Sequence, residues 1–130
     1  MISVGSIQKY YESIKLNIDT RTIEKYLEIL SNAKIIYPCN TFDIKSKTTL
    51  SGEKKYYLAD LSIYFLYNTD NRINYGPVLE NILYNYLVSK GYKLSVGKIG
   101  KLEVDFIARY NNDEYFYIKC IRKNRFFLLK

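Results

Sequence analysis

The chain has 130 residues, of which 48% are hydrophobic and 25% are charged, with a net charge of +7 and no histidine. This length allows one ordinary domain or two small ones, and no apolar run is long enough to cross a membrane. Without histidine, catalysis would have to use carboxylates, lysine, tyrosine or cysteine. The basic excess favours anionic partners, chiefly nucleic acid or an acidic protein surface, although a lysine-rich composition also serves solubility alone.

The first part of the chain predicts two helices. Apolar residues recur at helical spacing over residues 6–15, where Ser6 can cap, and again over residues 20–33, where Asp19 or Thr20 can cap. A tight polar turn between two short helices is typical of a helix-turn-helix. Arg21, Thr22 and Lys25, at the start of the second helix, could therefore face a DNA groove.

Two apolar runs, residues 35–42 and 54–60, flank a polar middle and predict two strands that form the wing of a winged helix. Pro38 is expected at a strand edge or bulge, because it cannot donate a hydrogen bond to the sheet. Residues 61–67 predict a short apolar helix or strand. The stretch 68–76 is rich in Asn, Asp and Gly and marks a domain boundary.

The second part predicts one helix followed by three strands. Residues 77–89 have a wide apolar face, with Pro77 suited to the first turn and Gly91 to the C-cap. Residues 92–98, 101–110 and 114–122 read as strands, and the last two form a hairpin. Cys39 and Cys120 lie in apolar runs without metal-ligand spacing, which indicates buried thiols in a reducing cytoplasm.

A group of charged residues falls on these predicted elements. The period of a strand puts Glu103 and Asp105 on one face of the first hairpin strand and Lys119 on one face of the second, while Glu80 lies on the preceding helix. This is the plan of a Mg²⁺-dependent phosphodiesterase, in which carboxylates bind the cation and a lysine orients water. The structural alternative is an ion-pair cluster in which Lys119 neutralises the carboxylates.

Three short motifs occur in a fixed order: Lys55-Tyr56-Tyr57-Leu58-Ala59-Asp60, Gly76-Pro77-Val78-Leu79-Glu80-Asn81 and Glu103-Val104-Asp105-Phe106. With these motifs the chain resembles the C-terminal domain of a group of prokaryotic AAA-type ATPases of unassigned function. The resemblance implies an α+β fold, with an N-terminal winged helix-turn-helix over residues 1–70 and a small restriction-endonuclease-like α/β lobe over 71–130; the two could also pack as one compact unit. No GxxxxGK[ST] loop is present, so the ATPase part is missing and no ATP site is expected.

The resemblance carries the nuclease plan over only in part. Glu80 matches the helix carboxylate and Asp105 the strand aspartate, but the next strand should read carboxylate-x-Lys and instead reads Tyr117-Ile118-Lys119-Cys120-Ile121. If Lys119 takes the carboxylate position, a metal ligand has become a cation. If it takes the lysine position, Tyr117 replaces the carboxylate, and a neutral phenol is a poor ligand for a hard metal. Either register leaves a degenerate site.

The sequence therefore predicts a non-catalytic nucleic-acid-binding or interaction module, with double-stranded DNA or a protein as partner and no cofactor. One alternative is a nuclease in which Glu80 and Asp105 hold Mg²⁺ and Lys119 acts beside them. A second alternative is a protein–protein adaptor that does not bind DNA. The C-terminal residues Arg122, Lys123 and Arg125 could grip a phosphate backbone, or the tail could continue a core element through Phe126–Leu129.

Overall fold

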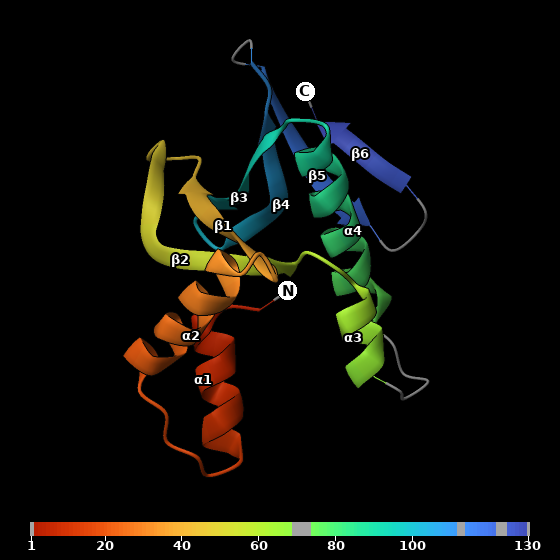
Figure 1. The fold of residues 1–130 in the computed structure, drawn as a ribbon. Coiled ribbons are helices and arrows are strands. Elements are labelled where there is room, and N and C mark those ends of the chain that lie inside the picture. Colours follow the sequence, from red (N-terminus) through yellow and green to blue (C-terminus); the bar gives the residue numbers. More distant parts are fainter. Residues whose placement is uncertain (1, 69–73, 112–113, 122–124, 130) are drawn as a thin grey trace.

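The computed structural model describes residues 2–68, 74–111, 114–121 and 125–129. Within these residues it forms a mixed α+β fold, as predicted, with four helices and one six-stranded sheet (Figure 1). None of the described helices has the length and apolarity to cross a membrane. In chain order the elements are α1 (Val4–Ser13), α2 (Thr20–Asn32), β1 (Ile36–Asp43), β2 (Thr48–Leu58), α3 (Ser62–Tyr67), α4 (Tyr75–Ser89), β3 (Lys93–Ile99), β4 (Leu102–Arg109), β5 (Tyr115–Ile121) and β6 (Arg125–Leu129).

The two predicted N-terminal helices are confirmed, with a shift at the first cap. Ser3, not Ser6, caps α1, and the two serines form a reciprocal capping box. In α2, Ile23 and Leu27 are buried and pack with Ile36 of β1. The rest of the predicted apolar stripe of α2 remains exposed, so only a narrow face of this helix contacts the body of the protein.

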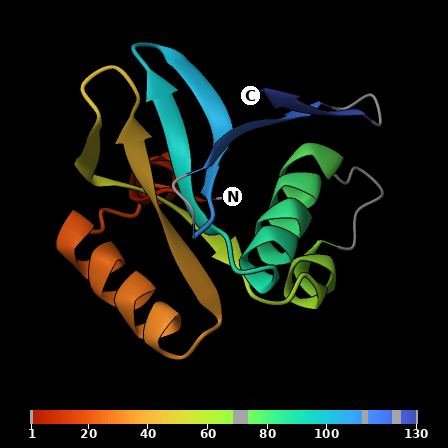
Figure 2. The same ribbon diagram turned by 90° about the horizontal axis from the view of Figure 1, so that it is seen from above.

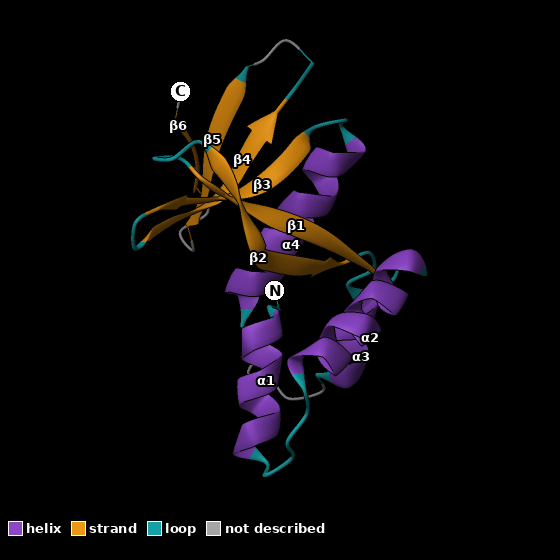
Figure 3. Ribbon diagram, turned by 90° about the vertical axis from the view of Figure 1, so that its left-hand side faces the viewer, coloured by secondary structure: helices purple, strands orange, loops and turns teal. Residues whose placement is uncertain are grey.

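The two strands predicted as a wing do form a β-hairpin, but this hairpin is part of the central sheet and is not a separate element. β1 and β2 pair antiparallel from Ile36↔Leu58 to Asp43↔Thr48, with a turn at residues 44–47 that is shorter than the predicted loop. β1 also pairs in parallel with β3, so the strand order is β2-β1-β3-β4-β5-β6. The hairpin therefore forms one end of the central sheet. In Figure 3 the strands form a strongly twisted sheet, with α1 and α2 below β1 and β2.

The helix and three strands predicted for the second part are also confirmed. The helix begins at Tyr75, two residues before Pro77, and Gly91 follows it with φ +85°. β3, β4 and β5 form an antiparallel meander, and β6 extends it by pairing with β5. Residues 61–67, for which the sequence left helix or strand open, contain α3. Seen from above in Figure 2, α3 and α4 lie on one flank of the sheet and α2 on the other.

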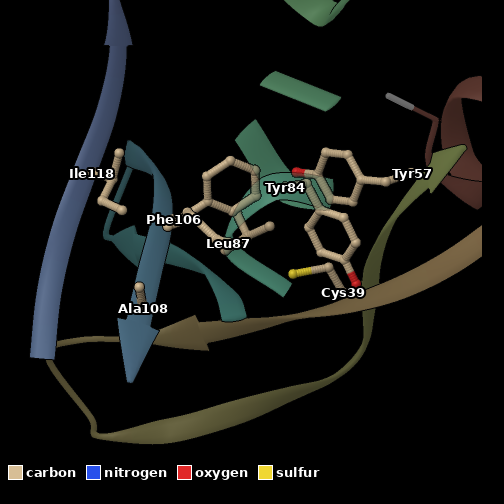
Figure 4. Packing of buried hydrophobic residues seen from close by; sticks show 8 residues of the cluster. Cys39, Tyr57, Tyr84, Leu87, Phe106, Ala108 and Ile118 are labelled. Carbon is tan, nitrogen blue, oxygen red and sulfur yellow. The ribbon is translucent and has the colours of Figure 1, made fainter. Parts of the chain in front are cut away.

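The main core draws on both halves of the chain (Figure 4). The Tyr57 ring of β2 stacks on the Tyr84 ring of α4, with 4.2 Å between centroids and an interplanar angle of 10°. Phe106 of β4 packs against both rings. Tyr57 and Tyr84 are therefore core residues. The other buried members are Cys39, Leu87, Val96, Ala108 and Ile118.

Candidate functional site

The charged residues singled out in the sequence meet where α4 faces the sheet. Glu80 lies in the second turn of α4 and is buried, because the helix turns this side toward β2. Asp105 is buried on β4, and Glu103 lies two residues earlier and is exposed. The structure thus brings the three carboxyl-bearing residues of the predicted cluster into one region and adds a lysine from β2 that the sequence did not single out.

Lys55 of β2 lies between two of these carboxylates. Its ammonium contacts Glu103 Oε1 and is 3.9 Å from Glu80 Oε1, and only 12% of its side chain is exposed. Glu80 Oε1 also accepts a hydrogen bond of 2.7 Å from the hydroxyl of Tyr57. Because Tyr57 and Lys55 project from the same strand, β2 supplies both the donor and the cation that satisfy the buried Glu80 carboxylate.

Asp105 is fully engaged from the other side. Its Oδ1 accepts from Lys119 Nζ at 3.0 Å and its Oδ2 from the backbone N–H of Cys120 at 2.5 Å. The Lys119 ammonium also donates to the backbone carbonyl of Glu103 at 3.1 Å. β5 therefore neutralises one carboxylate of β4 across the hairpin, as the ion-pair interpretation of the sequence expects.

A bulge in β4 turns Asp105 inward. Ser95 of β3 lies opposite Ile107, and Gly97 lies opposite Val104, so Asp105 and Phe106 together face the single residue Val96. An extra residue in one strand interrupts the alternation of side chains and redirects them. Here Asp105, Phe106, Ile107 and Ala108 are all buried in succession. Simple alternation in the sequence could not predict this arrangement.

Burial keeps the tyrosine hydroxyl and the cysteine thiols near the carboxylates protonated. The pKa of Tyr57 is raised well above its usual value by burial and then by the charge of Glu80, so its phenol remains a donor. Burial, with a smaller effect of Asp105, raises the pKa of the Cys120 thiol to about 11. Burial likewise raises the pKa of Cys39 to about 12. At neutral pH neither thiol supplies a thiolate nucleophile or metal ligand.

The geometry also shows which residue of β5, the second strand of the β4–β5 hairpin, lies beside Asp105. Lys119 contacts the Asp105 carboxylate, whereas Tyr117 lies opposite Ile107, farther along the strand. A cation thus lies beside the strand aspartate, where a divalent metal would need a further oxygen ligand.

The residues present do not fit a divalent cation. Magnesium and manganese require several free oxygen ligands, and among the described residues no group of three or more Asp, Glu, Cys or His side chains is placed to hold a metal. The ammonium groups of Lys55 and Lys119 instead contact the carboxylates that such an ion would use. This cluster is a set of ion pairs in which the Glu80 and Asp105 carboxylates are buried and the Glu103 and Lys119 side chains are partly exposed.

The residues predicted to contact nucleic acid lie elsewhere. Arg21, Thr22 and Lys25 are exposed on the first two turns of α2. Arg122 and Lys123 lie outside the described residues. Arg125 begins β6, and its side chain is outside the description as well.

Sequence reasoning missed Lys55, Tyr57 and Asn81 as members of this region. The side-chain amide of Asn81 on α4 accepts from the N–H of Leu58 and donates to its carbonyl, both at 2.8 Å, and so ties α4 to the end of β2. All three residues stand inside the motifs at 55–60 and 76–81. A lysine in an apolar strand was the available signal, but its partners become evident only once β2 is placed beside α4.

The chain belongs to the family described as a domain of unknown function (DUF8612), whose family model matches residues 2–72. It is 33% identical over 119 residues to an uncharacterized protein of Haemophilus influenzae, covering 92% of this chain and 30% of the relative. It is 29% identical over 127 residues to the uncharacterized protein MJ1544 of Methanocaldococcus jannaschii, covering 95% of this chain and 28% of the relative. The chain thus spans under a third of the length of either relative. No solved structure matches it.

Proposed function

We propose that this member of the DUF8612 family is a non-catalytic module that binds the sugar-phosphate backbone of double-stranded DNA. We further propose that it is built as a winged helix joined to a restriction-endonuclease-like lobe, similar to the C-terminal domain of prokaryotic AAA-type ATPases. The order α4-β3-β4-β5 supports the restriction-endonuclease-like lobe, because this order carries Glu80 on the helix, Asp105 on the second strand and Lys119 on the third. The two N-terminal helices, followed by the β1–β2 hairpin, support the winged helix.

The observation that carries the non-catalytic assignment is the pairing of the carboxylates with lysines. Glu80 and Asp105 are each 11% exposed at the side chain, and each has a lysine beside it. Buried carboxylates without a compensating cation are strongly unfavourable, so the protein supplies its own cations from β2 and β5. Metal-assisted hydrolysis needs those same oxygens to bind a metal and activate water. With both carboxylates engaged, the site lacks the ligands for that reaction.

The charge of the chain supports an anionic partner. A net charge of +7 attracts a polyanion over distances near the Debye length, and this attraction weakens as salt is added. Arg21 and Lys25 of α2 are exposed and add two cations to the face that a helix-turn-helix would turn toward DNA. Binding of this kind tolerates many sequences, because phosphates carry no base information.

The test is fluorescence anisotropy of a labelled random-sequence DNA duplex titrated with the chain at two salt concentrations, without divalent metal. We expect micromolar or tighter binding that weakens steeply between the two salts. Absence of binding at the lower salt would contradict the proposal. Cleavage of the duplex in Mg²⁺ or Mn²⁺ that is lost in Asp105→Ala would favour the nuclease alternative.

One observation favours the adaptor alternative. α1 and α2 enclose an open groove of about 540 Å³ whose lining is largely apolar, including Ile7, Tyr11, Tyr26 and Leu30. Tyr26 is 63% exposed and lines this apolar groove, and a contiguous exposed apolar surface is typical of a protein-binding site. If the chain is an adaptor, the wild type should bind a protein partner and Tyr26→Ser should lose that binding. The wild type should then show no affinity for the DNA duplex at either salt concentration.

A further inference from the structure

Two turns lie side by side at one end of the sheet. The parallel pairing of β1 with β3 aligns Asp43, the last residue before the turn at residues 44–47, with Lys98, which lies one residue before the end of β3 and the turn at residues 100–101. The N–H of Ile44 donates to the carbonyl of Lys98 at 2.9 Å and joins the first turn to the neighbouring strand. In Figure 2 both turns point to the same side of the molecule. We call residues 44–47 and 100–101 the paired turns.

The paired turns are rich in positive charge. Three of their six residues are lysines, Lys45, Lys47 and Lys101, and none is acidic. All three lysines are exposed. Among the residues that the structure describes, none of the three takes part in an ion pair. Two segments far apart in the sequence thus combine into one cationic surface.

The acidic residues nearest the paired turns are already bound. Asp43 accepts from the hydroxyl of Ser46 at 2.8 Å and from the N–H of Lys45 at 3.0 Å, and these hydrogen bonds, the one from Ser46 most of all, lower its pKa. Glu53 pairs with Lys98 at 2.9 Å, and Glu103 pairs with Lys55. Lysines thus neutralise Glu53 and Glu103, whereas Asp43 keeps its negative charge beside Lys45. The three lysines of the paired turns therefore leave an excess of two positive charges over the one acidic residue that no lysine pairs with among the described ion pairs.

The first turn is also preorganised. The Asp43 carboxylate closes the turn onto its own backbone, and the Ser46 hydroxyl lies 2.7 Å from the Thr48 hydroxyl. Lys47 sits at φ +55°, where its backbone continues the tight turn. A turn fixed in this way presents Lys45 and Lys47 with little ordering of the backbone on binding.

We infer that the paired turns are the surface that contacts the sugar-phosphate backbone of double-stranded DNA. Lysines are point charges without the bidentate geometry that reads bases, so this surface would anchor the duplex without selecting a sequence. The inference rests on the proposed function and assigns the main backbone contacts to the hairpin turns. It places them away from α2, because Figure 1 shows α1 and α2 below the β1–β2 hairpin and its turn pointing away from them.

The test compares three charge-removal variants by duplex anisotropy across a salt series, the first two lacking three cations each and the third lacking two. The first replaces the lysines of the paired turns (Lys45→Gln, Lys47→Gln, Lys101→Gln). The second, a matched control, removes the same charge elsewhere (Lys9→Gln, Lys15→Gln, Lys34→Gln); Lys15 and Lys34 match Lys47 in having positive φ, and all three are exposed. The third removes the α2 cations (Arg21→Gln, Lys25→Gln). Circular dichroism checks that each variant is folded.

We expect the paired-turn variant to lose at least about tenfold in affinity, with a slope of log K against log salt reduced by about 2 to 3, since each phosphate contact contributes about 0.9. The matched control should keep a slope close to that of the wild type. Equal losses in the first and second variants, or loss of the slope only in the α2 variant, would overturn the inference while leaving the proposed function standing. Failure of the wild-type chain to bind would instead overturn the proposed function itself.

Discussion

Lys55 is the cation that neutralises the Glu80 side of the carboxylate cluster. It is 12% exposed and lies between Glu80 and Glu103, so its removal leaves the buried Glu80 without its nearest cation. We expect Lys55→Met to lower the free energy of unfolding by about 3 kcal/mol, the scale of an uncompensated buried charge. The measurement is urea denaturation, and Lys55→Met combined with Glu80→Gln should recover part of the loss.

Lys54 provides the control for this substitution. It is the neighbouring residue on β2, but it is exposed and, among the described residues, outside the ion pairs. Lys54→Met should change stability by less than about 0.5 kcal/mol. If the two variants unfold at the same urea concentration as the wild type, Lys55 does not neutralise the cluster.

Lys119 should matter less than Lys55. A fully buried pair would lose about 3 kcal/mol in Lys119→Met. In the structure 46% of the Lys119 side chain is exposed, and Asp105 keeps its hydrogen bond from the Cys120 N–H. Solvent screens such a pair, so we expect a loss of about 1 kcal/mol in the same urea assay. A loss as large as that of Lys55→Met would contradict this, because it would mean that the Asp105 pair is shielded from solvent as well as the Glu80 pair.

At the scale of elements, Asn81 holds α4 to β2. Its amide pairs with both backbone groups of Leu58, as a further strand would. Asn81→Leu should cost about 1–3 kcal/mol, because it removes the side-chain partner of the partly buried Leu58 N–H, while the Leu58 carbonyl keeps a hydrogen bond of 3.0 Å from the Asn85 amide. Asn81→Asp keeps an acceptor for the Leu58 N–H and loses the donor to the carbonyl, so its effect should be intermediate. Thermal and urea unfolding check the ranking, and equal stability of all three proteins would refute it.

The sequence predicted the elements better than their pairing. Apolar periodicity located the helices and strands, because each depends on side chains only a few residues apart. It missed the parallel pairing of β1 with β3, since Thr41↔Val96 joins residues far apart in the chain and leaves no local pattern. It also missed the bulge at Asp105, which adds one residue to β4 and so redirects a side chain that alternation placed on one face.

The candidate site was predicted in the same uneven way. Glu80, Asp105 and Lys119 were found because charged residues are unusual in apolar runs. Lys55 stood in a quoted motif but had no visible partner, since its contacts come from α4 and β4. Long-range contacts of this kind follow from the tertiary fold, and only the resemblance of the motifs pointed toward them.

At the scale of the whole molecule, the two units predicted for residues 1–70 and 71–130 share a sheet and a core. Cys39 and Tyr57 come from the first range and pack with Phe106 of the second. The family model covers residues 2–72 and therefore ends before α4, which supplies Tyr84 and Glu80. The DNA surface and the neutralised cluster that we propose thus belong to one framework, with the paired turns at an end of the same sheet.

The claim that lysines, and not a bound metal, neutralise the carboxylates is tested most directly by the melting temperature of the wild-type chain with and without excess Mg²⁺ or Mn²⁺. A ligand that binds only the folded state raises the melting temperature as its concentration increases. Our account predicts that either ion leaves the melting temperature unchanged, and that Asp105→Ala responds to the ions in the same way as the wild type. A saturable increase in the wild type that is absent in Asp105→Ala would contradict it.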